Sequence, residues 1–179
     1  RRFVPRDMKP LERVLPTWVT TEMAGLIQAT MEFHTQCKNA DIDDGRHYWM
    51  YERSGELVGL AGYHWRCWDP PDVCWGGWYC VHPSLAAQQK LAVRTDLVVR
   101  CAEEPQFARL YMEVYADPAS SNVHALYSKL GFHQHGLVEN FYGQKKSLAI
   151  MSLSLDHIRP DMEPSGRSRK AAHGEKTKP

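Results

Sequence analysis

The spacing of apolar residues changes near residue 46, and this change constrains the fold more than any single motif does. Before it, five apolar residues recur at nearly helical intervals: Met23, Leu26, Ile27, Met31 and Phe33. After it, the ranges 47–53 and 56–65 have the composition of strands, and Ser54-Gly55 between them is a good two-residue hairpin signal. The chain therefore begins with helices and continues as a sheet.

Beyond this hairpin, strand and helix patterns alternate. We expect further strands over 2–4, 73–81, 109–115, 135–142 and 148–155. We expect helices that end at Pro16, open at Thr20-Thr21-Glu22, and cover 86–101 and 121–130. In the helix over 86–101, the apolar residues should face the core and three cations should face solvent: Lys90, Arg94 and Arg100. This order predicts an α/β (α+β) fold whose mainly antiparallel sheet gains a strand–helix–strand crossover.

Charge and composition exclude several classes of protein. The 179 residues carry 22 Lys and Arg against 21 Asp and Glu, and this balance argues against a dedicated nucleic-acid binder. No apolar run approaches the roughly 20 residues needed to cross a bilayer, and no signal-peptide core opens the chain. The five cysteines are odd in number and form no CxxC pair, which is typical of free thiols in a reducing compartment. We therefore expect a cytoplasmic protein with no membrane partner.

The chain divides into two parts by composition. Residues 1–159 have the length and apolar content of one globular domain. Residues 160–179 are rich in Pro, Gly, Ser, Lys and Arg and contain no aromatic residue, which predicts a disordered, mildly basic tail. A solvated terminus is the simplest interpretation of this tail, and contact with nucleic acid or a protein partner is the alternative.

The most informative motifs follow the strand over 73–81. That strand ends in Val81-His82-Pro83 and leads through a loop into a helix, an arrangement that presents free backbone N–H groups to an anion. Further on the chain reads LYMEVYADP from Leu110, then NVHALYSKLGF from Asn122, and it closes with a Tyr-Gly pair and IMSLSL.

These motifs and their order resemble the GNAT superfamily of acetyl-CoA-dependent N-acetyltransferases. The LEV-like string and the LYxKLGF string are most similar to those of the N-terminal acetyltransferases of ribosomal proteins. The resemblance covers 48–155 by motif and 1–38 by element order alone. It implies a sheet of about six or seven strands with a splayed parallel pair, about four helices, acetyl-CoA as co-substrate, direct transfer to a primary amine, and a homodimer.

The resemblance also implies site residues. The pantetheine arm of acetyl-CoA would pair with the strand at Tyr79, Cys80 and Val81. The pyrophosphate would bind the loop and first helical turns, which comprise Ala86, Ala87, Gln88, Gln89, Lys90, Leu91 and Ala92. Tyr127 would lie beside the thioester and protonate the departing thiolate, and Glu113 would be the general base. Either Ser120 or Asn122 would contact the cofactor, and residue type favours Asn122.

One departure from the family pattern supports a second hypothesis. The family's phosphate loop is rich in glycine, whereas the range 86–92 contains none. Either a continuous helix whose N-terminus points at the phosphate replaces that loop, with Lys90 helping, or cofactor binding is weak. In the second case the chain would be a catalytically silent module that binds acyl-CoA weakly or only a protein partner.

Several of these candidate residues could also have a purely structural role. Glu113 could simply pair with a neighbouring charge, and Tyr127 could be a core aromatic residue. Aromatic residues crowd two strands and their loop, where they could form core or line an acceptor pocket: Tyr63, Trp65, Trp68, Trp75, Trp78 and Tyr79. The acidic turn at 41–44 could lend negative potential to the mouth of a site for cationic amines. No His or Cys spacing predicts a metal site.

Overall fold

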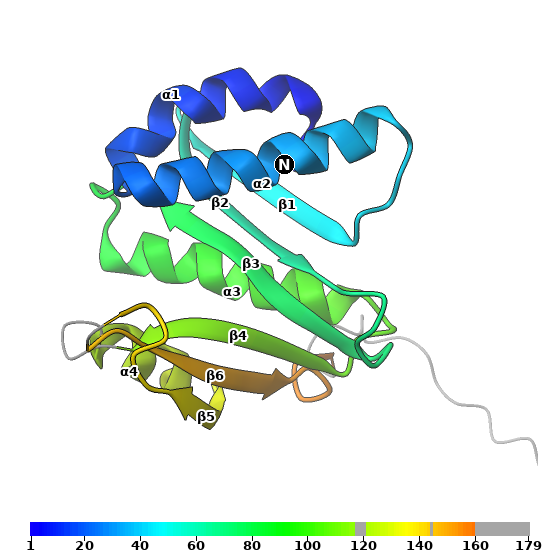
Figure 1. Cartoon of the computed structure of the whole chain (residues 1–179), viewed down its shortest axis with the longest axis vertical. Coiled ribbons are helices and arrows are strands. Elements are labelled where there is room, and N and C mark those ends of the chain that lie inside the picture. Colours follow the sequence, from blue (N-terminus) through cyan, green and yellow to red (C-terminus); the bar gives the residue numbers. More distant parts are fainter. Residues whose placement is uncertain (117–120, 144, 160–179) are drawn as a thin grey trace, which may run out of the picture.

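A computed structural model of the chain describes residues 1–116, 121–143 and 145–159 (Figure 1). A short 3-10 helix at Pro5–Asp7 precedes four α-helices: α1 Met8–Trp18, α2 Thr21–Asn39, α3 Ala87–Glu103 and α4 Ser121–Lys129. The six strands are β1 Arg46–Arg53, β2 Glu56–His64, β3 Val73–Val81, β4 Arg109–Ala116, β5 His133–Val138 and β6 Ser147–Ser154. They form one mixed sheet in the order β1-β2-β3-β4-β6-β5. The mainly antiparallel α/β architecture is therefore confirmed.

Local sequence signals explain several element boundaries. The Thr20 hydroxyl accepts a hydrogen bond from the Met23 amide and caps α2. Both hairpin residues, Ser54 and Gly55, have positive φ, as a two-residue turn between β1 and β2 requires. After α4, Gly131 has a φ of 90° and the Phe132 amide bonds back to the Tyr127 carbonyl, which closes the helix.

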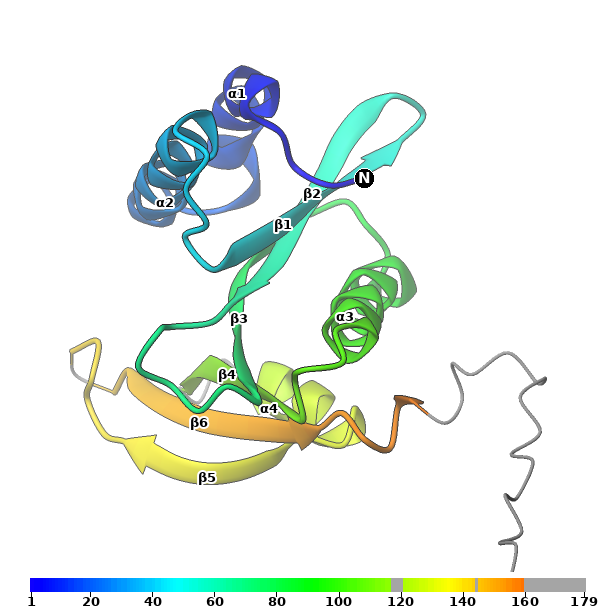
Figure 2. The same ribbon diagram turned by 90° about the vertical axis from the view of Figure 1, so that its right-hand side faces the viewer.

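The helices cover the two faces of the sheet in pairs (Figure 2). Helices α1 and α2 pack on one face with Tyr48, Met50, Leu60 and Cys80, and we name this the α1–α2 face. Helices α3 and α4 pack on the opposite, α3–α4 face, where the core takes residues from all of β1 to β4 and from β6. The α1–α2 core draws on β1, β2 and β3 only, so within the described residues that face of β4 has no helix in its core.

The only parallel pair of the described sheet, β3 and β4, separates part-way along. The strands pair from Val73–Arg109 to Trp75–Tyr111 and no further, and Figure 1 shows them diverging toward their carboxyl ends. A bulge accompanies the separation, because Gly62 of β2 faces both Gly77 and Trp78. The expected splayed pair is therefore present, and it opens at Gly76.

Three expectations about secondary structure were wrong. Residues 2–4 form only an isolated bridge between Arg2 and Trp49. Pro16 lies inside α1, which continues to Trp18 because the side chains of Leu15 and Trp18 are buried under α2 and the sheet. The strand expected over 135–142 is β5 at 133–138, since its second half enters a loop in which Asn140 and Gly143 adopt positive φ.

In the part of the chain that the structure describes, no helix is long and apolar enough to cross a membrane. The tail at 160–179 lies outside the described residues.

Candidate functional site

The opening between β3 and β4 presents a free strand edge. From Gly76 to Val81, β3 bonds β2 on one side, and no described strand pairs with its other edge. The side chains of Tyr79 and Val81 point to the α3–α4 face, and the buried Cys80 points to the α1–α2 face. An extended amide-bearing ligand could therefore add to this edge as a further strand.

The N-terminus of α3 follows the end of β3 directly. Its first turn is held by the Gln89 side chain, whose Oε1 accepts from the Ala86 amide at 3.0 Å. Lys90 braces the preceding turn by donating from Nζ to the Pro83 carbonyl at 2.9 Å. Within the described residues, the amides of Ala87 and Gln88 have no intrachain acceptor, as is usual at a helix start. These amides and the helix dipole favour an anion at this point.

This loop does not need glycine to keep its shape. None of the residues 82–92 has a positive φ, so a Cβ is tolerated at each position. The region is a regular helix start, and Ala87 and Gln88, whose amides would bind a phosphate, are exposed residues. Of the two explanations for the missing glycines, the backbone therefore fits the continuous helix.

Arg94 lies inside the site, which corrects the expectation that it faces solvent. Its guanidinium carbon is 4.2 Å from the centre of the Tyr79 ring and 5.5 Å from that of Tyr127. The Arg94 Nε is buried without a hydrogen-bond partner. The sequence period contained the signal for this position, because Arg94 is three residues before Leu97 and four before Val98, which are both buried in α3. The expectation that Arg94 faces solvent rested on its charge alone.

Two tyrosines flank Arg94 and hold their protons. Burial raises the pKa of Tyr79 to about 12, and its hydroxyl donates to the Lys90 carbonyl at 2.8 Å. Burial also raises the pKa of Tyr127, while the neighbouring Arg94 cation lowers it in part. The Tyr127 ring packs edge-on against Phe132 at 5.2 Å. Tyr127 is thus a buried, protonated phenol beside a cation, as a proton donor in the opening would be.

Glu113 lies on the opposite face of the sheet from Tyr127. Leu110, Met112 and Val114 of β4 are buried in the α3–α4 core, so strand alternation places Glu113 on the α1–α2 face. There its Oε1 lies 3.7 Å from Arg66 Nη2, and both side chains are partly exposed. Such an exposed pair contributes about 0–1 kcal/mol, so it holds Glu113 only loosely. Since β3 and β4 are apart at this level, groups on both faces have access to the opening.

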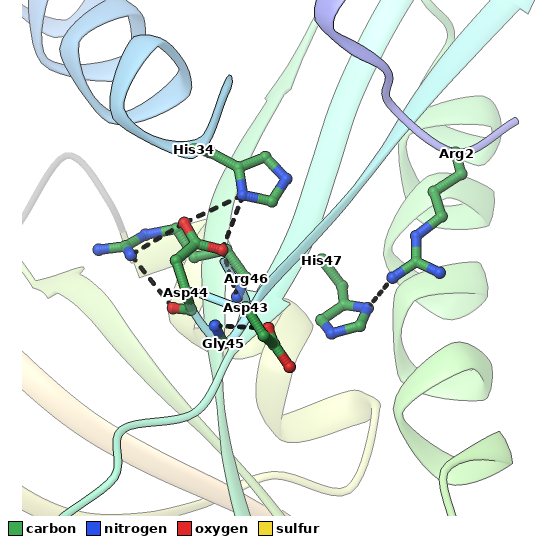
Figure 3. Close-up of polar contacts among 7 residues, drawn as sticks. All are labelled: Arg2, His34, Asp43, Asp44, Gly45, Arg46 and His47. Atoms are coloured by element: carbon green, nitrogen blue, oxygen red, sulfur yellow. Dashed lines mark hydrogen bonds and ion pairs between the residues drawn. The ribbon is translucent and has the colours of Figure 1, made fainter. Parts of the chain in front are cut away.

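A cavity of about 490 Å³ lies beside this pair, between the start of β1 and the end of β2. Figure 3 shows how its polar wall is built: the buried His34 donates from Nδ1 to both oxygens of Asp44, at 2.9 and 3.0 Å. Arg46 Nη1 lies 3.3 Å from the same carboxylate. Asp43 accepts from the Gly45 amide at 2.9 Å, so the acidic turn is held by its own backbone and by α2.

The four tryptophans that the sequence analysis named lie in three different places. Trp65 and Trp68 line the cavity, Trp75 contacts Arg66 and Tyr111, and Trp78 packs against the α1–α2 core. Ser120 and the Asn122 side chain lie outside the described residues. In the described ranges no three His, Cys, Asp or Glu side chains gather to hold a metal ion.

No family model matches the sequence, and no curated protein does. Solved structures are similar along nearly the whole chain. A GNAT-family protein from Desulfovibrio desulfuricans aligns with a TM-score of 0.73 at 19% identity, over 87% of this chain and 97% of that one. The fold is GNAT.

Two further similar structures belong to enzymes that are named for different amine substrates. The ribosomal-protein-S18-alanine N-acetyltransferase from Escherichia coli aligns with a TM-score of 0.64 at 16% identity, over 87% of this chain and 92% of that one. The spermidine/spermine N-acetyltransferase SpeG from Vibrio cholerae, in mutant forms, aligns at 0.68 and 11%, over 91% and 96%. At these identities the similarity shows the GNAT fold alone.

Proposed function

We propose that the chain is an acetyl-CoA-dependent N-acetyltransferase that moves an acetyl group to a primary amine by direct attack. The observation that carries this proposal is the free β3 edge at 76–81, which leads straight to the exposed amides of Ala87 and Gln88. The strand edge can hydrogen-bond the two amides of the pantetheine arm of acetyl-CoA, and the helix start can bind the pyrophosphate of the same cofactor. Both features exist here without a glycine-rich loop.

The side chains supply two of the proton transfers that the reaction needs. Glu113, on the accessible face of β4, accepts a proton from the acceptor's ammonium group, directly or through water. The neutral amine then forms the new C–N bond at the thioester carbonyl as the C–S bond breaks. Tyr127 protonates the departing thiolate, because burial keeps its phenol in the protonated form. The new amide nitrogen releases its second proton to water, and Tyr127 and Glu113 regain their starting protonation states by exchange with water. The opening between β3 and β4 connects the faces on which the two residues lie.

A catalytically silent module with the same fold is the alternative. The missing glycines were its main support, and the regular backbone at 82–92 weakens that support. The roles of Glu113 and Tyr127, the cytoplasmic location and the homodimer stay predictions.

Thermal unfolding with and without acetyl-CoA separates these functions at the binding step. A ligand at one hundred times its dissociation constant stabilises the folded state by about 2.7 kcal/mol, which raises the midpoint by a few degrees. Desulfo-CoA should give a similar shift, since it keeps the pyrophosphate and pantetheine. No shift at millimolar acetyl-CoA would rule out the proposed enzyme. A shift without acetylation of any amine would support the silent module.

A further inference from the structure

The ion pair between Arg66 and Glu113 carries information about the acceptor. Its N–O distance of 3.7 Å is much longer than the 2.7–2.9 Å of a tight charge-assisted hydrogen bond. The side chains are 34% and 47% exposed, so both charged groups remain open to a ligand. Glu113 can take up an ammonium group only if Arg66 then finds another anion, since an unpaired cation beside a bound ammonium would repel it.

Arg66 is held in place by an aromatic platform. Its guanidinium carbon lies 4.9 Å from the centre of the Trp75 ring, and the Trp75 indole N–H donates to Asp69 Oδ2 at 2.8 Å. Trp75 in turn packs against Tyr111 at 5.1 Å. These two aromatic residues form the last backbone pair of β3 and β4 before the strands separate. The Arg66 cation is therefore fixed beside the point where the opening begins.

The cavity of about 490 Å³ extends from Arg66 and gives room for an attached side chain. Trp65 and Trp68 contribute to its lining, as does His64, whose pKa burial and the nearby Arg66 and Arg46 lower to about 4. His64 is therefore uncharged at neutral pH and adds no further cation to this wall. Asp44, which also lines the cavity, is already bonded to His34 and Arg46.

We propose that the acceptor is a free amino acid, with its ammonium group at Glu113, its carboxylate at Arg66 and its side chain in the cavity beside Arg66. One carbon atom separates amine from carboxylate in an α-amino acid, so its two charges fit a cation and an anion that already lie side by side. A polyamine or aminoglycoside offers only cations, which Arg66 repels. A peptide N-terminus has a neutral carbonyl where Arg66 requires an anion.

This inference rests on the proposed function, and an acceptor competition tests it separately. The full chain is incubated with acetyl-CoA and one of three acceptor sets: the common free L-amino acids, their amides, or spermidine. Products are identified by mass spectrometry, and kcat/KM is measured for the best free acid and its own amide. We expect the free acid to exceed its amide at least ten-fold and spermidine to be a poor acceptor.

Substitution of Arg66 then assigns the preference to a residue. Arg66→Met should lower kcat/KM for the free acid at least ten-fold and raise that for the amide, whose ammonium group then no longer meets an unpaired cation. Arg66→Lys should restore part of the preference, because it restores the charge without the planar fork. Arg53→Met, at an exposed position in the β1–β2 hairpin, is the matched control and should keep the preference.

The possible results are distinguishable. Equal or better turnover of amides or spermidine, or acetyl-CoA binding with no product from any acceptor, would overturn the amino-acid inference. A free-acid preference that survives Arg66→Met would also overturn it, since the carboxylate would be bound elsewhere. Failure of acetyl-CoA to bind at all is a different result, which the thermal shift detects without any acceptor and which removes the proposed function itself.

Discussion

The guanidinium carbon of Arg94 lies 4.2 Å from the centre of the Tyr79 ring, on the side of β3 that faces α3. A cation over a phenol ring is favourable, and here it also reaches Tyr127 at 5.5 Å. Arg94 of α3 thereby contacts residues of both β3 and α4, the elements from which the candidate cofactor and proton-donor residues come.

Arg94→Met should raise the pKa of Tyr127 further. The buried phenol would lose the cation that offsets part of its desolvation, so its anionic form would become less stable. A general acid works only while protonated, so activity falls as pH rises through this pKa, and in the variant that fall should move to higher pH. Spectrophotometric titration of tyrosinate, compared with the Arg94→Met/Tyr127→Phe variant, measures the shift directly. An unchanged profile would show that Arg94 does not influence Tyr127.

Tyr127→Phe should lower turnover by about 10²–10⁴-fold, the usual contribution of general acid catalysis. The ring contact with Phe132 remains, so the fold should be retained. The measurement is kcat at saturating acceptor, accompanied by the unfolding midpoint. Tyr63→Phe is the matched control, because it also removes a hydroxyl from a buried tyrosine, here one bonded to Glu104. It should change stability without affecting turnover.

Ala87→Asp should separate helix stability from cofactor affinity. An aspartate in the first turn of α3 interacts favourably with the helix dipole, by about 0.3–1 kcal/mol. The same charge repels a pyrophosphate at the exposed amides, so we expect at least a ten-fold weaker affinity for acetyl-CoA with no loss of stability. Calorimetric titration provides the affinity. Thr95→Asp, exposed in the middle of the same helix, should leave the affinity unchanged.

Gly77→Ala should destabilise the bulge that accompanies the opening. An added Cβ would lie 2.9 Å from the Tyr48 hydroxyl oxygen and 3.2 Å from the Gly62 carbonyl oxygen. Such overpacking costs about 1–3 kcal/mol of unfolding free energy, which urea denaturation measures. Gly25→Ala in α2 meets nothing within 4 Å and should instead stabilise the protein by about 0.5–1 kcal/mol. Similar effects from both substitutions would contradict the model of the bulge.

His64→Gln should flatten the acid side of the stability profile. Burial, together with Arg66 and Arg46, lowers the pKa of His64 from 6.5 to about 4. Between these values the unfolded chain binds a proton that the folded chain does not, so stability is present above pH 6.5 and is lost as pH falls toward 4. The loss amounts to at most about 3 kcal/mol. Urea midpoints at several pH values measure it, and His133→Gln on exposed β5 is the control.

Local patterns predicted the element order well, because each depends on residues close together in the chain. The hairpin at Ser54-Gly55, the cap at Thr20 and the helix end at Gly131 all appear where the sequence places them. Pro16 does not end α1 as expected, because the burial of Leu15 and Trp18 outweighs the tendency of proline to break a helix. Residues 2–4 have an alternation too short to distinguish a strand from a single bridge between Arg2 and Trp49.

The sequence by itself therefore determined the helices, the strands and the motifs that resemble an acetyltransferase. Only the tertiary structure decided which side chains meet. The period of α3 places Arg94 on its inner side, but the two tyrosine rings that Arg94 contacts come from β3 and α4, which only the packing of α3 brings to it. Arg66 meets Glu113 although they are 47 residues apart, because the β2–β3 loop returns to the junction of β3 and β4. Such pairings depend on strand order and register, which no local spacing encodes.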